Sequence, residues 1–134
     1  MKFLEVSAAI LVYNNKILCM QRGEGKYDYI SFKYEFPGGK IELGESPKEA
    51  LKRELIEEMD LNISMGDMQF CYTVNHKYPD FEITMHSFIC TMRSDIFRLK
   101  EHVNYKWMSY ENLDELDWAP ADLPIVNELM KKGL

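Results

Sequence analysis

A chain of 134 residues with 46% hydrophobic and 28% charged side chains can bury one core, and this composition excludes an intrinsically disordered protein. The net charge of −6 disfavours a protein that binds DNA or RNA duplexes, because such proteins present a basic face. Three cysteines without C-x-x-C spacing, and an N-terminus without a long apolar stretch, predict a reduced, cytoplasmic protein with no membrane span.

The first third of the chain predicts a hairpin followed by a loop. Residues 6–13 are mostly small or branched apolar residues and predict a buried strand, with residues 16–21 as its hairpin partner. Residues 23–33 have no clear period, so they are either a mobile rim around a substrate pocket or a plain connection. Residues 37–39 (Pro-Gly-Gly) predict a turn at which the backbone approaches a ligand closely.

The next segment predicts a helix with an unusual arrangement of charge. Ser46 and Glu49 form the pattern of a capping box at its start. Glu54, Glu57 and Glu58 crowd one face near its C-terminal end, where like charges destabilise by roughly 0.2–0.5 kcal/mol per pair and the helix dipole disfavours anions. The ordinary explanation is a solvated face. The alternative is a site for Mg²⁺ or Mn²⁺, which bind carboxylate oxygens.

The rest of the chain predicts three further strands, at residues 68–75, 81–92 and 105–108. Residues 93–104 predict a polar loop and residues 111–116 a helical turn. Residues 122–132 predict an amphipathic helix that begins at Asp122. Strands that alternate with two main helices predict an α/β protein with a mixed sheet flanked by helices.

The spacing around the first helix resembles the signature of the Nudix hydrolases, G-x5-E-x7-R-E-U-x-E-E-x-G-U, in which U is an aliphatic residue. Its positions are occupied here by Gly39, Glu45, Arg53, Glu54, Leu55, Glu57, Glu58 and Leu61. Only Asp60 departs, since the family has glycine there; Asp is among the few residues that tolerate the left-handed backbone conformation. The resemblance implies a single Nudix hydrolase domain over residues 1–134, folded as an α/β/α sandwich with a mixed sheet.

Two further strings are similar to particular branches of the family. Residues 35–42 (EFPGGKIE) resemble the MutT-type nucleoside triphosphate pyrophosphohydrolases, and residues 119–124 (APADLP) resemble the A-P-A-D-x-P string of the CTP pyrophosphohydrolases. The resemblance implies metal-dependent hydrolysis of a (deoxy)nucleoside triphosphate to monophosphate and pyrophosphate, with Mg²⁺ or Mn²⁺ as cofactor. It favours a pyrimidine substrate: CTP, dCTP or a modified dCTP.

Several alternatives remain open at this point. The substrate is otherwise an oxidised purine such as 8-oxo-dGTP, or another nucleoside diphosphate derivative such as ADP-ribose. A non-catalytic domain that binds nucleotides or damaged bases is disfavoured, because such domains usually lose carboxylates that this chain retains. A small nucleotide is the expected partner of a monomer or homodimer.

The resemblance also implies a set of metal ligands, namely the Gly38 carbonyl and the carboxylates of Glu54, Glu57, Glu58 and Glu101. Arg53 is expected to orient one of these carboxylates through a forked hydrogen bond. Glu45 is either a further ligand or a structural acceptor. The catalytic set is Arg53, Glu54, Glu57 and Glu101, and the general base is either Glu54 or Glu101.

Substrate binding is expected from Arg22 and Lys40 on the phosphates, although either is equally well explained as a solvated charge. Asp122 is expected to accept a hydrogen bond from a base amino group such as cytosine N4, and a simple helix cap is the competing explanation. Trp118 is expected in the core rather than as a stacking wall. No histidine is assigned a catalytic role.

Overall fold

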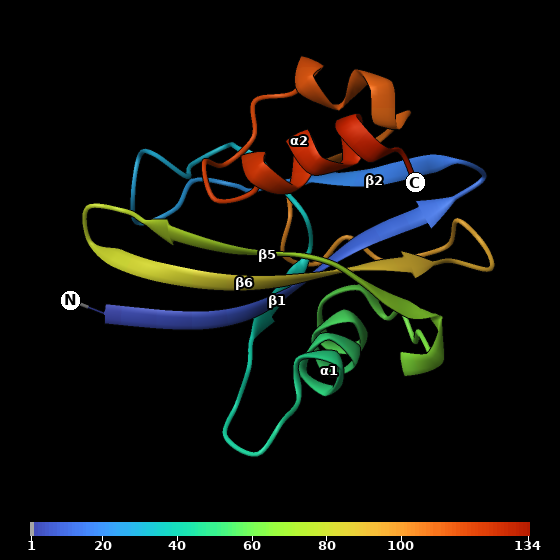
Figure 1. Cartoon of the computed structure of the whole chain (residues 1–134), viewed down its shortest axis with the longest axis horizontal. Coiled ribbons are helices and arrows are strands. Elements are labelled where there is room, and N and C mark those ends of the chain that lie inside the picture. Colours follow the sequence, from blue (N-terminus) through green and yellow to red (C-terminus); the bar gives the residue numbers. More distant parts are fainter. Residues whose placement is uncertain (1) are drawn as a thin grey trace.

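The structure, a computed structural model, describes residues 2–134 and has one mixed sheet between two helices (Figure 1). Helix α1 (Pro47–Met59) covers one face, and helix α2 (Leu123–Lys132) covers the other. Two 3₁₀ helices, η1 (Met65–Asp67) and η2 (Tyr110–Glu115), complete the helical content of this part of the chain. This arrangement confirms the predicted α/β/α sandwich. No helix within residues 2–134 is long and apolar enough to cross a membrane.

The sheet has seven strands, β1 (Lys2–Tyr13), β2 (Lys16–Gln21), β3 (Tyr34–Glu35), β4 (Gly38–Lys40), β5 (Met68–Lys77), β6 (Phe81–Thr91) and β7 (Asn104–Met108). Its main path runs β3-β2-β1-β6-β5, with β4 paired to β1 and β7 paired to β2. The β1–β6 pair is parallel and all other pairs are antiparallel, so the sheet is mixed as predicted.

Strand β1 shows why its apolar run is continuous. Ala8 and Ile10 belong to the buried cluster on the α2 side, whereas Ala9 and Leu11 belong to the cluster on the α1 side. Because successive side chains of a strand point to opposite faces, a strand covered on both faces needs apolar residues at every position. All four of these residues are almost fully buried.

Helix α1 begins and ends as the sequence predicts. The Ser46 hydroxyl accepts a hydrogen bond from the Glu49 N–H, and the Glu49 carboxylate accepts one from the Ser46 N–H, which completes the capping box. Leu51 and Leu55 are fully buried against the sheet. The helix ends at Asp60, which has left-handed dihedral angles of φ 50° and ψ 36°.

The glycine pair differs from the prediction of a turn. Gly38 and Gly39 lie in β4, which pairs with β1 opposite Ala8 and Ser7. A side chain on Gly38 would collide with the Ser7 carbonyl oxygen, and one on Gly39 would collide with the Glu54 carboxylate. The close approach that these glycines permit is therefore to β1 and to α1 within the same chain.

Strands β1 and β2 pair only near their shared turn, at Val12–Ile17 and Tyr13–Lys16. Beyond these pairs β2 separates from β1 (Figure 1) and pairs instead with β3 and β7, while β4 takes the place beside β1. The ends of β2, β3 and β4 thus border an opening in the sheet, and this opening positions the site described next.

Candidate active site

A cavity of about 330 Å³ lies at this opening. Its lining residues come from the loop after β2, from β3, β4 and α1, and from the loop after β6; they are Arg22, Gly23, Glu24, Glu35, Gly38, Glu58, Glu101 and His102. Four of the residues predicted for the site, Arg22, Gly38, Glu58 and Glu101, are therefore brought together. The cavity combines a guanidinium, a backbone carbonyl and several carboxylates.

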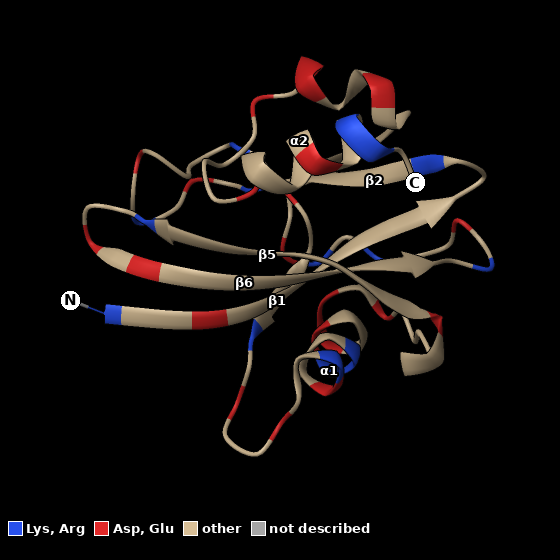
Figure 2. Ribbon diagram, in the orientation of Figure 1, with Lys and Arg blue, Asp and Glu red and all other residues tan. Residues whose placement is uncertain are grey.

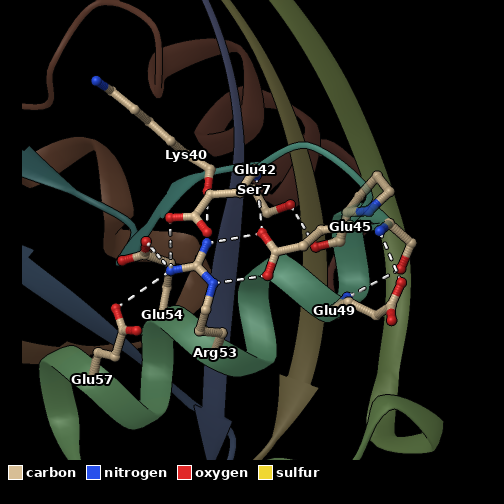
Figure 3. Close-up of polar contacts among 10 residues, drawn as sticks. Ser7, Lys40, Glu42, Glu45, Glu49, Arg53, Glu54 and Glu57 are labelled. Carbon is tan, nitrogen blue, oxygen red and sulfur yellow. Dashed lines mark hydrogen bonds and ion pairs between the residues drawn. The ribbon is translucent and has the colours of Figure 1, made fainter.

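Arg53 does not line this cavity, but it organises the acidic residues of α1 and of the loop before it (Figure 3). Its Nε and Nη2 donate to the two carboxylate oxygens of Glu45 at 2.8 and 2.9 Å. Its Nη1 donates to Glu54 at 2.8 Å and to Glu57 at 3.3 Å, and Nη2 also donates to the Lys40 carbonyl at 3.0 Å. The fork therefore binds Glu45, and the predicted metal ligands Glu54 and Glu57 each receive a single bond.

Glu45 is a structural acceptor in this arrangement. Besides the two bonds from Arg53, it accepts the Glu42 N–H at 2.9 Å. The hydrogen bonds from Arg53, and then the one from Glu42, lower the pKa of Glu45 from 4.5 to about 2. Of the two roles left open for Glu45, this geometry favours the structural one, because both of its oxygens are already occupied.

The carboxylates of α1 differ in their surroundings. Glu54 is held by Arg53 and is mostly buried, whereas the Glu57 side chain is 59% exposed. Burial, a hydrogen bond with Glu54 and the nearby charges of Glu101 and Glu35 raise the pKa of Glu58 from 4.5 to about 8. Figure 2 shows acidic segments on the loop before α1 and along α1, with basic segments among them on the helix.

These carboxylates have the donor chemistry of a Mg²⁺ or Mn²⁺ site. Within residues 2–134, however, no three His, Cys, Asp or Glu side chains converge closely enough to form a ready-made metal-binding group. Burial, and after it the neighbouring carboxylates, raise the pKa of Glu58 and so disfavour its charged form. A divalent cation would stabilise that charged form, so the residues present fit such an ion once their side chains adjust.

Two cavity residues, Glu35 and His102, were missed by the sequence reasoning. The Glu35 carboxylate contacts Arg22 Nη1 at 3.3 Å through one oxygen and His102 Nε2 at 2.8 Å through the other. The His102 side chain is only 6% exposed. A lone histidine without ligand spacing carries no sequence signal. Glu35, however, is the first residue of the EFPGG string, and this string was a signal that could have identified it.

The Lys40 side chain takes no part in the cavity. In Figure 3 it extends away from the carboxylates around Arg53, and only its backbone carbonyl joins the network. Lys40 therefore needs a different side-chain conformation to reach a phosphate at the cavity. The two explanations weighed for it, phosphate contact and solvated charge, are both compatible with this position.

Asp122 is buried, with 3% of its surface exposed, and it does not line the cavity. One carboxylate oxygen accepts the Phe36 N–H at 2.9 Å, and no side-chain capping bond is made to α2. Asp122 therefore occupies the N-cap position of α2, as predicted, and caps the helix through its backbone carbonyl rather than its side chain. Burial, reinforced by the nearby charge of Glu35, raises the pKa of Asp122 well above its usual value.

Two aromatic groups frame this region. Trp118 is buried against Phe36, and its Nε1–H donates to the Leu113 carbonyl at 2.6 Å, so the prediction of a core position is confirmed. In the loop between β2 and β3, Tyr29 stacks on Tyr78 of the β5–β6 turn with ring centroids 5.0 Å apart, and the Tyr29 hydroxyl donates to Asp80 at 2.8 Å. The loop thus packs onto that turn instead of merely connecting strands.

Comparisons with known proteins agree with this geometry. The model of the family described as NUDIX domain matches residues 3–129. The 8-oxo-dGTP diphosphatase of Escherichia coli (strain K12) is 32% identical over 132 residues, covering 98% of this chain and 99% of that protein. The CTP pyrophosphohydrolase of the same strain is 33% identical over 132 residues, covering 97% and 93%. The solution structure of the E. coli ORF135 protein matches with a TM-score of 0.82 and 31% identity, covering 98% and 91%.

Proposed function

The chain belongs to the Nudix family, and from that membership we propose that it hydrolyses a (deoxy)nucleoside triphosphate to the monophosphate and pyrophosphate in a metal-dependent reaction. The observation that carries the proposal is the cavity in which Arg22 meets Gly38 and the carboxylates of Glu58 and Glu101. A polyphosphate needs both cations and metal-binding oxygens, and this cavity offers both. Residues 1–134 act as one Nudix domain in this proposal.

The metal ligands in the proposal are Glu54, Glu57, Glu58 and Glu101, with the Gly38 carbonyl. A bound Mg²⁺ or Mn²⁺ supplies Lewis-acid polarisation of the phosphoryl oxygens and lowers the pKa of a water molecule toward neutrality. Burial, and after it the nearby carboxylates of Glu54, Glu101 and Glu35, raise the pKa of Glu58; this supports the assignment, because a bound cation would stabilise the charged carboxylate.

The remaining steps belong to the side chains of the chain itself. Arg22 binds a phosphate oxygen from the wall of the cavity while Glu35 keeps its guanidinium in place. Arg53 holds the Glu54 carboxylate in a fixed orientation from outside the cavity. Water adds across one phosphoanhydride bond, and its proton passes to Glu54 or Glu101, the two carboxylates proposed as general base.

For the base, we propose a pyrimidine: CTP, dCTP or a modified dCTP. The support is the APADLP string and the likeness to a protein named CTP pyrophosphohydrolase. Asp122 is the proposed reader, since a carboxylate accepts a hydrogen bond from cytosine N4. Its buried position beside Phe36 means that the loop between β2 and β3 or α2 has to admit the base to it.

Oxidised purines form a second candidate substrate class. The specific observation in its favour is the 32% identity to a protein named 8-oxo-dGTP diphosphatase, which covers almost the full length of both chains. Both candidates use the same cavity for the phosphates and differ only at the base. A cytoplasmic location, where these nucleotides occur, stays a prediction, as does the choice between monomer and homodimer.

The test is a pyrophosphate-release assay with Mg²⁺ over the standard triphosphates, 8-oxo-dGTP, 5-substituted dCTPs and ADP-ribose. Selective turnover of cytidine substrates that Asp122→Asn alters supports the pyrimidine proposal. Turnover of 8-oxo-dGTP alone replaces it with the second candidate. Full activity in the presence of EDTA, or unchanged turnover in Glu57→Gln, contradicts the metal assignment.

A further inference from the structure

Asp60 is the one signature position at which this chain departs from the family pattern. Its backbone is left-handed, a conformation that glycine adopts at lower cost than any residue with a side chain. The end of α1 therefore does not require an aspartate. The side chain of Asp60 needs another explanation, and its contacts supply one.

The Asp60 carboxylate connects the end of α1 to the loop after β6. One oxygen lies 2.6 Å from Lys100 Nζ, and the other lies 3.4 Å from Arg98 Nε. The backbone joins the same contact, because the Arg98 N–H donates to the Met59 carbonyl at 2.9 Å.

Lys100 strengthens this attachment by a second bond. Its Nζ also donates to the Glu57 carbonyl at 3.3 Å, one of the carbonyls that the end of a helix leaves without a partner. Beyond the cavity the loop is attached again, where the Val103 N–H donates to the carbonyl of Gln21 in β2 at 3.0 Å. Between the attachments at Lys100 and Val103 lie only two residues, Glu101 and His102.

Both of those residues line the cavity. Glu58, which lines it from the opposite element, stands two positions before Asp60 on α1. The contact between Asp60 and Lys100 thus links the element that carries Glu58 to the segment that carries Glu101. Fixing this link fixes how far apart the two cavity carboxylates lie.

We propose that Asp60 is a positioning residue that acts through Lys100 and Arg98 to hold Glu101 in the cavity opposite Glu58. The inference rests on the proposed function, in which both carboxylates bind metal. In this inference, the aspartate that replaces the family glycine increases the affinity for metal. The increase is small, because both ion pairs of Asp60 are partly exposed to solvent.

The test compares Asp60→Gly with the unmodified protein. Glycine suits the left-handed position, so the variant should fold and melt like the parent protein. We expect the Mg²⁺ concentration for half-maximal pyrophosphate release to rise by about three- to tenfold, the range that the loss of two partly exposed ion pairs allows. Lys100→Met should reproduce the rise. Asp67→Asn is the matched control, because it removes an exposed ion pair with Arg93 on the same loop, away from the cavity.

Two further measurements separate this inference from the proposed function. Hydrogen exchange at the Arg98 amide should accelerate in Asp60→Gly, and this readout does not need activity. In a Glu101→Gln background, Asp60→Gly should raise the Mg²⁺ requirement no further, since its effect passes through Glu101. An unchanged exchange rate, an unchanged Mg²⁺ requirement in an active enzyme, or additive effects with Glu101→Gln overturns the inference. An inactive parent protein refutes the proposed function instead.

Discussion

Replacing Arg53 by lysine tests whether one guanidinium orders the acidic side of the site. Arg53 donates five hydrogen bonds, to Glu45, Glu54, Glu57 and the Lys40 carbonyl. Lysine keeps the charge but has three donors and no planar fork, so at least two bonds are lost. Bonds to charged groups contribute about 1.5–3 kcal/mol each, and exposure reduces this, so the free energy of unfolding should fall by about 1–2 kcal/mol.

The effect on catalysis should be larger than the effect on stability. Arg53 does not line the cavity, so the KM for the nucleotide should change little. Its bond to Glu54 at 2.8 Å sets the orientation of that carboxylate, and misplacing a catalytic group by about 1 Å costs on the order of a hundredfold in kcat. Urea unfolding and steady-state pyrophosphate release, measured at the same pH, give the two quantities.

Two variants control this experiment. Glu45→Gln disturbs the fork but leaves the Arg53–Glu54 bond, so it should reduce stability and spare most of the turnover. Lys48→Gln removes a positive charge from the same helix at a position where the ammonium lies over the Phe88 ring, 6.0 Å from its centroid. If Glu45→Gln lowers kcat as much as Arg53→Lys does, or if Arg53→Lys keeps full turnover, the assigned role of Arg53 is refuted.

Three other predictions follow from the site. Gly39→Ala should cut turnover by about a hundredfold while the melting temperature changes little, because the three atoms nearest to the new side chain belong to the Glu54 carboxylate. Kinetics equal to those of the parent protein would contradict this. His102→Leu should raise the nucleotide KM by about tenfold, because the hydrogen bond between His102 and Glu35 is lost. His102→Gln should restore most of the affinity, and equal KM values in both variants would refute the role of this hydrogen bond. The pKa of Glu45 is lowered to about 2 in the folded protein, against the ordinary value of 4.5 that applies to the unfolded chain. The ionised Glu45 carboxylate therefore contributes fully to the free energy of unfolding above pH 4.5, and this contribution is lost as the pH falls through 2. Thermal unfolding should therefore show a difference between the parent and Glu45→Gln that disappears toward pH 2, and a pH-independent difference would argue against it.

Local sequence signals predicted helix α1 well. The capping box of Ser46 and Glu49 and the left-handed end at Asp60 depend on residues a few positions apart. A short stretch of sequence is therefore enough to predict where the helix begins and ends. Strand β4 was missed for the opposite reason. Gly38 and Gly39 form a strand only because β1, distant in sequence, offers Ser7 and Ala8 as partners.

The residues of the site also differ in whether a local or a long-range interaction places them. The carboxylates of α1 were predicted because the motif spaces them along one helix, and the structure places Glu58 of this set in the cavity wall. The contact of Glu35 with His102 joins residues 67 positions apart, and no short pattern encodes it. Asp122 precedes a helix and was read as a possible cap, yet burial directs its carboxylate to the Phe36 N–H of a different element. Tertiary packing overrides the local preference at this residue.

The parallel pairing of β1 with β6 also constrains the order in which the chain assembles. The register sets Lys2 opposite Phe81 and Val12 opposite Thr91, so the central strand acquires this neighbour only after most of the polypeptide is available. Contacts of such high sequence separation slow folding, because a long loop must close before they form. Until then, among the described strands, β1 can pair with β2 and β4 but lacks its longest partner. We expect refolding in stopped-flow experiments to be slower for the whole molecule than for a helical protein of equal length, and the nascent chain to be most prone to aggregate before β6 has emerged.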